Sequence, residues 1–476
     1  MVQRDFDLIV IGSGPAGEKA AIQAAKMHRS VAIVERESVQ GGVCLHTGTI
    51  PSKTLRETVV YMSGLRQRSV YGLAAAMRTD LTVRELMYRK GQVVQQELDV
   101  IAQNMARHRI EVIHGTGEIV DPHTVLVHGR NGGTRSLTGE AIIISTGTRS
   151  YRPPDIDFDG PYIYDAESII DLDRIPDRLT IIGGGVIGCE YASIFSHIGV
   201  KVTIVDLRTR LLSFLDHELG DALMYLMRKY GVSFVLADVS EKISVEGDEV
   251  VTLTRAGRRI VADRLLYAAG RCGNTEALGL EGLGIRTDDL GLIKVNEKYQ
   301  TAVPNVFAVG DVIGFPSLAS VSMDQGRLAA VHAFRSDDIA CLNNLLPFGI
   351  WTIPEVAILG ETEESLAAQG HEYEVGTARY FELARGQIIN DHDGLLKLIF
   401  DIDAGRLLGV HIIGERANEL IHIGQAVMTY GGTIDYFVDT VFNYPTLTEA
   451  YKVAALDGLS RLAFRASRAS SRRVAD

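Results

Sequence analysis

The chain has 476 residues, of which 46% are hydrophobic and 23% charged, and its formal net charge is −12. This length suffices for three or four domains, and the negative charge argues against a nucleic-acid or anionic-membrane partner. No apolar run approaches the roughly 18 residues that a membrane span needs, and the opening residues lack a signal-peptide pattern. The four cysteines form no C-x-x-C pair, so we expect a reduced, soluble and cytoplasmic protein.

The first predicted element is a short buried strand that ends in a glycine-rich turn. Residues 7–17 read DLIVIGSGPAG, a helix of small residues follows, and the next apolar run ends at Glu35, 23 positions after Gly12. This order sets a pyrophosphate at a helix N-terminus and an acid at the height of a ribose. The residues expected to hold this first dinucleotide are Gly12, Gly14, Pro15, Ala16, Gly17, Glu35 and Arg36.

The next stretch, GGVCLHTGTIPSK at 41–53, has the form of a redox loop with one sulfur missing. Cys44 is present, but Thr49 stands where a second thiol would complete C-x4-C. A hydroxyl cannot carry electrons, so Cys44 cannot form a redox disulfide with it.

A second dinucleotide-binding pattern occupies the middle of the chain. Residues 179–188 read LTIIGGGVIG, and the following strand ends at Asp206, again 23 positions after the first glycine of the turn. Two complete units indicate two dinucleotides between which electrons pass, although a vestigial second site is an alternative. The expected binding residues are Gly183, Gly185, Val186, Ile187, Gly188, Asp206, Arg208 and Arg210.

The residues after the second acid offer two kinds of ribose contact. A carboxylate such as Asp206 suits a free 2′-hydroxyl, whereas the guanidinium groups of Arg208 and Arg210 suit a 2′-phosphate. We therefore expect NADH and NADPH both to bind. The alternative is that these arginines merely begin a solvated loop.

The last part of the chain, about 346–466, starts with GIWTIPEVAILG and passes through alternating strands into the apolar helix ERANELIHIGQAV. His422 in that helix is interpreted as a packed or solvated residue. No group of side chains has metal-ligand spacing, so no metal is expected. The basic stretch RASRASSRR at 465–473 is interpreted as a frayed terminus.

These motifs together resemble the flavoprotein disulfide reductases, the family of lipoamide dehydrogenase and glutathione reductase. Three further stretches carry the resemblance: AIIISTGTRS (141–150), TAVPNVFAVGDV (301–312) and FNYPTLTEAY (442–451). It implies an α/β fold with two Rossmann-like dinucleotide-binding domains, for FAD and NAD(P), and a C-terminal α+β dimerisation domain. The implied division is a first FAD part at 1–150, an NAD(P) domain at 151–272, a second FAD part at 273–345, a dimerisation domain at 346–466 and a flexible basic tail at 467–476.

The resemblance also assigns roles around the flavin. Lys53 would reach the N5 side of the ring and pair with Glu190, and Asp311 would meet the ribityl chain. The helix after Leu318 would point its positive N-terminus at the N1–C2 carbonyl of the flavin. The further implied FAD residues are Gly42, Val43, Cys44, Lys53, Thr146, Gly147, Gly310, Asp311, Leu318 and Ala319, and the further NAD(P) residues are Glu190 and Gly270.

The chain departs from the family at two positions that serve the same chemistry. Thr49 replaces the flavin-facing thiol, and Tyr444 stands where the disulfide reductases place a histidine before the proline, while Glu449 remains. A phenol with a pKa near ~10 is a poor proton shuttle beside an imidazole near ~6.5. The candidate catalytic residues are Cys44, Thr49, Lys53, Glu190, Tyr444 and Glu449.

Hydride transfer between nicotinamide and flavin needs neither a thiol nor an imidazole. GTIPSK, IGCEYASIF and FNYPTLTEAY are similar to the versions found in family members that exchange hydride between two nicotinamide coenzymes. The implied function is FAD-dependent, reversible transhydrogenation between NADPH and NAD+ through flavin N5, with ping-pong kinetics. The implied assembly is a homodimer or larger homo-oligomer that places Tyr444 across a two-fold axis. The alternatives are an NAD(P)H-dependent flavin reductase or diaphorase acting on quinones, a dihydrolipoamide dehydrogenase with an unusual loop, and a non-enzymatic flavin-binding scaffold.

Overall fold

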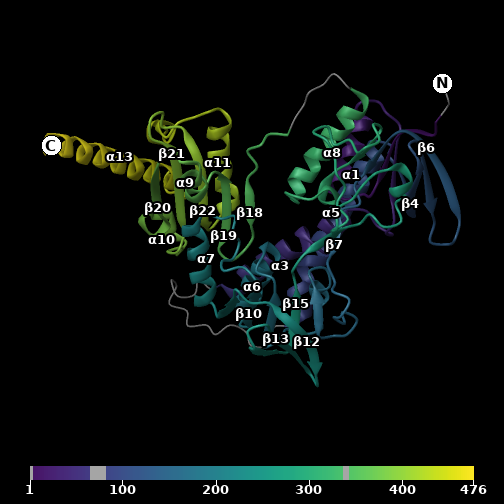
Figure 1. The fold of residues 1–476 in the computed structure, drawn as a ribbon, viewed down its shortest axis with the longest axis horizontal. Helices are drawn as coiled ribbons and strands as arrows, with labels where there is room; N and C mark the ends of the chain where they lie inside the picture. The colour runs from purple at the N-terminus through teal and green to yellow at the C-terminus, as the bar shows by residue number, and fades with distance from the viewer. Residues whose placement is uncertain (1–3, 65–81, 336–341, 476) are drawn as a thin grey trace.

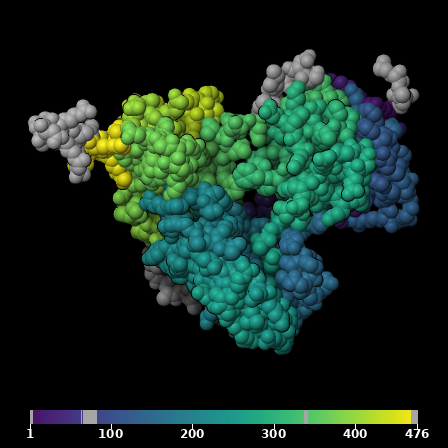
Figure 2. All heavy atoms as spheres, viewed as in Figure 1, coloured from purple at the N-terminus to yellow at the C-terminus, as the bar shows by residue number. Residues whose placement is uncertain are grey.

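The computed structural model describes residues 4–64, 82–335 and 342–475. Of the sequence predictions, Cys341 and the part of the first FAD segment at 65–81 lie outside these ranges. Figure 1 shows three groups of elements, which we call the first, middle and C-terminal domains. In this view the middle domain lies below the other two, and the space-filling view in Figure 2 shows a notch between the C-terminal domain and the first.

The first domain is built on a seven-stranded sheet with the order β3-β2-β1-β6-β5-β4, in which β17 also pairs with β6. Strands β3, β2, β1, β6 and β17 run parallel and need cover on both faces, which explains the apolar run predicted for β1. β17 brings the chain after residue 300 into the sheet of the N-terminal segment. The strands are β1 (Phe6–Ile11), β2 (Val31–Glu35), β3 (Glu111–His114), β4 (Thr116–Asp121), β5 (Thr124–His128), β6 (Thr134–Ile144) and β17 (Val306–Ala308).

Helices cover one face of this sheet. The other face is covered by the β4–β5 meander and by the loops that carry Leu278, Ile285 and Ile293. α1 and α8 approach closely because small residues face each other: a Cβ on Gly326 would lie 2.0 Å from the carbonyl oxygen of Ala16. The helices of this domain are α1 (Pro15–Lys26), α2 (Gly42–His46), α3 (Thr49–Ser63), α5 (Val83–Arg107) and α8 (Ala319–Phe334), with the 3₁₀ turns η2 (Glu281–Leu283) and η3 (Gly310–Ile313).

The middle domain has a parallel five-stranded sheet with the order β11-β10-β9-β15-β8. A three-stranded antiparallel sheet, β12-β13-β14, packs on it through Val250, Ile243 and Ile260. Its elements are β8 (Ile163–Asp165), η1 (Ile169–Asp171), β9 (Arg178–Ile182), α6 (Val186–His197), β10 (Lys201–Asp206), α7 (His217–Lys229), β11 (Val232–Leu236), β12 (Ser240–Glu246), β13 (Glu249–Thr254), β14 (Arg259–Ala262) and β15 (Arg264–Tyr267).

A two-stranded ribbon links the first two domains. The chain leaves the first domain through β7 (Thr148–Ser150) and returns through β16 (Arg271–Gly273), and these strands pair antiparallel with Cys272 opposite Arg149. Both crossings therefore lie side by side, next to the ends of β6 and β15.

The C-terminal domain has an antiparallel sheet with the order β18-β19-β22-β21-β20. α11 and α13 pack on it through an apolar core that includes Leu420, Val410 and Ala454. Its elements are β18 (Phe348–Ile350), β19 (Glu355–Gly360), α9 (Glu363–Gln369), β20 (Tyr373–Arg379), η4 (Tyr380–Glu382), α10 (Ala384–Ile388), β21 (Leu395–Asp401), β22 (Leu407–Gly414), α11 (Ala417–Thr429), α12 (Asp435–Asp439) and α13 (Glu449–Ala475).

The end of the chain differs from the prediction. A frayed terminus was expected at 465–473 and a flexible basic tail at 467–476, but α13 continues to Ala475 and projects from the domain. No glycine or proline stands between Arg461 and Ala475 to end the helix, and alanine and arginine favour it.

The predicted fold class is confirmed, because two parallel-sheet α/β domains with glycine-rich first turns precede one α+β domain. Within the described ranges, no helix is both long enough and apolar enough to cross a membrane.

Candidate active site

The first glycine-rich turn joins β1 to α1 and can be built only with glycine at two positions. Gly12 has a φ of 103°, and a Cβ there would lie 2.5 Å from the carbonyl oxygen of Ser145. A Cβ on Gly17 would lie 2.0 Å from the carbonyl oxygen of Gly12. The turn is therefore tight, and α1 starts in contact with the strand that precedes it.

The start of α1 is open where a phosphate would approach. Gly14 is its N-cap and makes no side-chain cap, and Pro15 and Ala16 follow as the first helical residues. Apart from chain neighbours, no described heavy atom lies within 4 Å of a Cβ placed on Gly14. Gly42 of α2 faces this turn, since a Cβ on it would lie 3.0 Å from the Gly14 Cα. This is the cradle that a dinucleotide pyrophosphate requires.

The first predicted acid is held inside the turn. Glu35 accepts bonds at Oε2 from Ser13 N (2.9 Å) and Ser13 Oγ (2.5 Å), and at Oε1 from Glu37 N (2.9 Å). A carboxylate has about four acceptor positions, so one remains for a ribose hydroxyl. Arg36 is exposed and lies 3.4 Å from Glu37.

The segment at 41–53 folds as α2 and the start of α3. The Thr49 side chain lies beside the Cys44 thiol. Burial raises the pKa of Cys44, and the neighbouring Thr49 and the charge of Lys53 only partly offset this. The thiol is thus protonated at neutral pH and a poor nucleophile. The described cysteines, Cys44, Cys189 and Cys272, are all free thiols.

Lys53 of α3 makes the pair with Glu190 that the resemblance implied. Its Nζ donates to Oε2 of Glu190 at 2.6 Å, and Oε1 of the same carboxylate accepts from Trp351 N at 2.9 Å. Glu190 is 4% exposed, so this ion pair is largely removed from water. It fixes α3, α6 and the start of the C-terminal domain to one another, and it leaves two N–H donors of the ammonium group for another partner.

Asp311, in η3, faces the link between the first two domains. It accepts from Thr148 Oγ1 at 3.4 Å and from Ser322 Oγ at 3.5 Å. Burial raises the pKa of Asp311 above its usual value, and the nearby Arg271 partly offsets this. The carboxylate is placed to accept a hydrogen bond from a hydroxyl group of a ligand.

Two further features match a bound dinucleotide. Thr146 Oγ1 is buried without a hydrogen-bond partner among the described residues, and α8 starts at Ala319 with no side-chain cap on Leu318. Gly147 and Gly310 turn the chain with φ of 66° and 76°. An orphaned hydroxyl and an uncapped helix start both need a partner, so the residues of the first site fit FAD.

The second glycine-rich turn repeats the geometry of the first. Gly183 has a φ of 104°, and a Cβ on Gly188 would lie 1.9 Å from the Gly183 carbonyl oxygen. Gly185 is the N-cap of α6, without a side-chain cap, and Val186 and Ile187 follow it. This helix start is also open to a phosphate. Gly270, exposed with a φ of 120°, follows β15 beside it.

Substituting Gly188 by alanine should weaken binding of NAD(P)H by about tenfold or more, because the overpacked methyl displaces the turn at a cost of about 1–3 kcal/mol. FAD content should stay unchanged. Coenzyme titration and flavin absorbance measure the two effects. Gly220→Ala is the matched control, since no described atom outside its own chain neighbourhood lies within 4 Å of a Cβ there. Unchanged coenzyme affinity in Gly188→Ala would contradict this assignment.

The second acid is fully engaged by its own loop. Oδ1 of Asp206 accepts from Arg208 N (2.8 Å) and Nε (2.9 Å), and Oδ2 accepts from Gly184 N (2.5 Å) and Arg208 Nη2 (2.7 Å). Burial would raise the pKa of Asp206, but these bonds outweigh it and hold the pKa below its usual value. Arg210 Nη2 instead donates to both oxygens of Asp221, at 2.7 and 2.9 Å.

Tyr444 and Glu449 are not joined to the flavin-side residues in the single chain. Tyr444 is 72% exposed, and Glu449 starts α13 with Oε2 buried and lacking a hydrogen-bond partner among the described residues. No hydrogen bond or ion pair in the described part of the chain connects either of them to Lys53.

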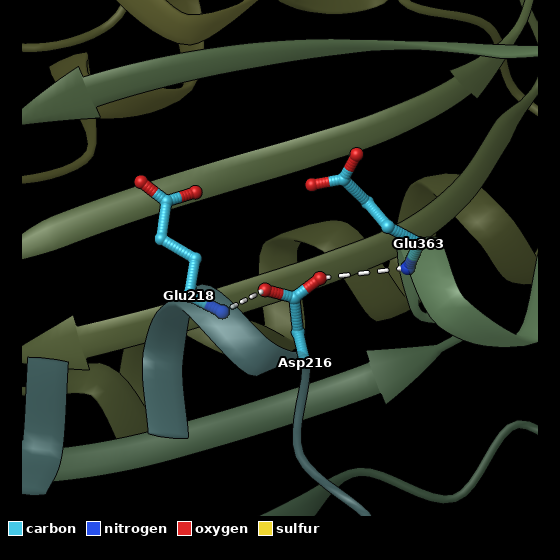
Figure 3. A group of neighbouring side chains, drawn as sticks. All are labelled: Asp216, Glu218 and Glu363. Atoms are coloured by element: carbon cyan, nitrogen blue, oxygen red, sulfur yellow. Dashed lines mark hydrogen bonds between the residues drawn. The ribbon is translucent and has the colours of Figure 1, made fainter. Parts of the chain in front are cut away.

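One acidic cluster has the spacing of a metal site but contains an ammonium group. Carboxylate oxygens of Asp216, Glu218 and Glu363 lie within 4.8 Å of one another (Figure 3). Lys397, 1% exposed, places Nζ 2.9 Å from Asp216 and 3.3 Å from Glu218, and it also bonds Glu363. The lysine supplies the positive charge, so the cluster fastens α7 to β21 and we assign it no metal.

Comparison with known proteins bears on these two sites. The family model described as pyridine nucleotide-disulphide oxidoreductase matches residues 6–326. The chain belongs to the pyridine nucleotide-disulphide oxidoreductase family. The model of that family's dimerisation domain matches residues 346–455. The chain is an oxidoreductase, and the cofactors predicted for it, FAD and NAD(P)H, are those of the family.

Curated relatives agree with the more specific resemblance. The chain is 46% identical over 460 residues to a protein from Mycobacterium tuberculosis named soluble pyridine nucleotide transhydrogenase, which covers 96% of this chain and 98% of the relative. A protein of the same name from Pectobacterium atrosepticum is 46% identical over 97% of this chain and 99% of its own length.

Solved structures of the family share the fold. The HOCl-induced flavoprotein disulfide reductase RclA from Escherichia coli has a TM-score of 0.85 at 28% identity, covering 94% of this chain and 99% of its own. LpdA from Mycobacterium tuberculosis has a TM-score of 0.88 at 25% identity with the same coverage.

Sequence reasoning missed several residues that complete the site. Trp351 was quoted only as part of the start of a domain, yet its N–H holds Glu190. Arg271 donates to Thr148 at 2.8 Å and faces Asp311. A backbone donor carries no signal in the sequence, whereas the arginine directly after Gly270 could have been noticed.

Proposed function

We propose that this protein transfers hydride reversibly between NADPH and NAD+, with the two coenzymes binding one after the other at the middle domain. The single observation that carries the proposal is that Thr49 stands beside the Cys44 thiol, where a redox disulfide would need a second sulfur. The name of the relatives at 46% identity supports it.

When bound, FAD supplies a ring that accepts a hydride at N5 from one nicotinamide and returns it to another. Lys53 would lie beside the ring and offer a positive charge to its reduced form, while Glu190 keeps the ammonium group in place. The uncapped start of α8 would offer partial positive charge to the bound cofactor.

The segment at 41–53 lacks the groups that would pass electrons to a disulfide. Cys44 has a hydroxyl for a neighbour and a raised pKa, so it neither forms a disulfide with residue 49 nor acts as a thiolate. Tyr444 in place of a histidine removes the acid–base partner that disulfide exchange requires. A second nicotinamide is therefore the electron acceptor that we propose.

The ribose end of the middle domain serves both coenzymes. Arg208 now occupies the Asp206 carboxylate, and we propose that it turns to the 2′-phosphate when NADPH binds and leaves Asp206 to the ribose hydroxyls when NADH binds. We further propose that the enzyme works in the cytoplasm as a homodimer, in which the exposed Tyr444 of each chain faces the partner's flavin side.

Anaerobic spectroscopy of the FAD-loaded enzyme tests this function. NADPH should bleach the flavin, and NAD+ added after removal of NADP+ should restore its absorbance with formation of NADH. Initial rates should give the parallel-line pattern of a ping-pong mechanism. Converging lines, which indicate a ternary complex, would contradict the proposal that both coenzymes use one site in turn. Rapid quinone turnover with negligible coenzyme exchange would instead favour a diaphorase.

A further inference from the structure

The two arginines after Asp206 have different partners. Arg208 covers the Asp206 carboxylate, and together with Gly184 N it fills all four acceptor positions of that group. Its Nη2 lies 4.0 Å from a Cβ placed on Gly185, so the guanidinium lies over the glycine-rich turn. Arg208 is thus already at the ribose end of the coenzyme site.

Arg210 is two residues further along the same loop but is held from another direction. The next residue, Leu211, packs on the turn: a Cβ on Gly184 would lie 2.4 Å from Leu211 Cδ2 and 3.1 Å from Asp206 Oδ2. The Arg210 guanidinium nevertheless donates to both oxygens of Asp221 in the first half of α7. The side chains are 37% and 61% exposed, so a phosphate can compete for the arginine.

The position of Asp221 is set by α7, and the start of this helix is anchored in the protein interior. The N-cap of this helix is Asp216, which is completely buried and accepts from Lys397 Nζ at 2.9 and 3.0 Å. The loop that carries both arginines therefore runs between two buried, hydrogen-bonded carboxylates, Asp206 and Asp216. Asp221 lies on the helix that this anchor positions.

We propose that Asp221 sets the balance between the two coenzymes by holding Arg210 away from the 2′-phosphate of NADPH. The inference rests on the proposed use of both coenzymes at this one site. With Arg210 restrained, a single guanidinium binds the 2′-phosphate, and NADP+ can leave so that NAD+ can take its place. With Arg210 free, two guanidinium groups bind the phosphate and favour the phosphorylated coenzyme.

Binding of two fragments that carry no nicotinamide isolates this effect from hydride transfer. Calorimetry on the full-length, FAD-loaded protein should use ADP-ribose and 2′-phospho-ADP-ribose. Asp221→Asn should bind the phosphorylated fragment about three- to tenfold more tightly than the parent enzyme does, and ADP-ribose within about twofold. An unchanged ratio of the two affinities would overturn the proposal.

A double variant separates release of Arg210 from the loss of one negative charge. Arg210→Gln alone should change affinity for the phosphorylated fragment by less than about twofold, because the arginine is already engaged. Added to Asp221→Asn, it should abolish the gain, and a gain that persists would overturn the proposal. Glu246→Gln is the matched control: it breaks an exposed pair with Arg259 at 2.9 Å, on the β12–β13 hairpin far from α7.

The fragments also distinguish a failure of the proposed function from a failure of the role proposed for Asp221. If the parent enzyme binds neither fragment, the proposed function fails at its coenzyme site and the inference fails with it. If both fragments bind and Asp221→Asn leaves their ratio unchanged, the role of Asp221 alone is refuted.

Discussion

Replacing Lys53 by methionine should lower the rate of coenzyme exchange by about 10²–10³-fold, the loss typical of removing one preorganised charge from a reaction centre. Methionine keeps the length and the apolar contacts of the side chain, so the change removes mainly the ammonium group. The effect should fall on reduction of the flavin, because positive charge at its N5 side is needed most in the reduced state. Stopped-flow absorbance after anaerobic mixing with NADPH measures this step directly.

Lys53→Arg is the control that keeps the charge and should retain most of the rate. Among the described residues, the methionine variant leaves the buried Glu190 carboxylate with the Trp351 N–H as its one remaining partner, so unfolding of the variant must be measured in parallel. Adding Glu190→Gln relieves the unpaired charge. If that double variant regains stability but stays slow, the ammonium group itself serves the reaction. A fast methionine variant would remove Lys53 from the chemistry.

The sites could be predicted from sequence where the backbone allows only one residue type. Gly12, Gly17 and Gly188 stand where any Cβ would strike a carbonyl oxygen or its neighbours, so the spacing of the glycines reports the turn itself. The acids Glu35 and Asp206 follow at the ends of the next strands, because parallel strands present their carboxyl ends at one edge. These are local consequences of one strand, one turn and one helix.

The ion pairs that join the domains could not be predicted from the sequence in the same way. The Lys53–Glu190 pair spans 137 positions and was reached only through the family resemblance. Lys397 lies in a strand of apolar residues and gives no local sign that Asp216, 181 positions away, neutralises it. A buried charge is tolerated only where an oppositely charged group lies beside it in the fold. That group can be far away in the chain, and the sequence alone does not identify it.

Arg56 provides the second large effect, in this case on stability. It is 5% exposed, donates from Nε to the carbonyl of Thr352 at 3.0 Å, and lies 3.3 Å from Glu355, which is 6% exposed. Arg56→Met should lower the free energy of unfolding by about 3–5 kcal/mol, because it leaves the Glu355 carboxylate buried without its cation. Chemical denaturation followed by flavin and tryptophan fluorescence measures this.

The pH dependence of that loss follows from the sign of the pKa shift. Burial raises the pKa of Glu355 above its ordinary 4.5, and Arg56 partly offsets the rise. In Arg56→Met this offset is gone, so the folded pKa rises further while the unfolded value stays the same. Between the two values the folded state binds more protons, so stability falls as pH rises through this window. The deficit of the variant should therefore be smaller at pH 5 than at pH 7.

Removing both charges distinguishes an unpaired carboxylate from simple loss of packing. Arg56→Met with Glu355→Leu should regain most of the lost stability, because two apolar groups of similar volume replace a buried ion pair at little cost. A double variant as unstable as Arg56→Met would show that the arginine acts through its other contacts. Since Arg56 lies one helical turn after Lys53 on α3, the unpaired variant should also be slow in coenzyme exchange, and the double variant should recover both properties together.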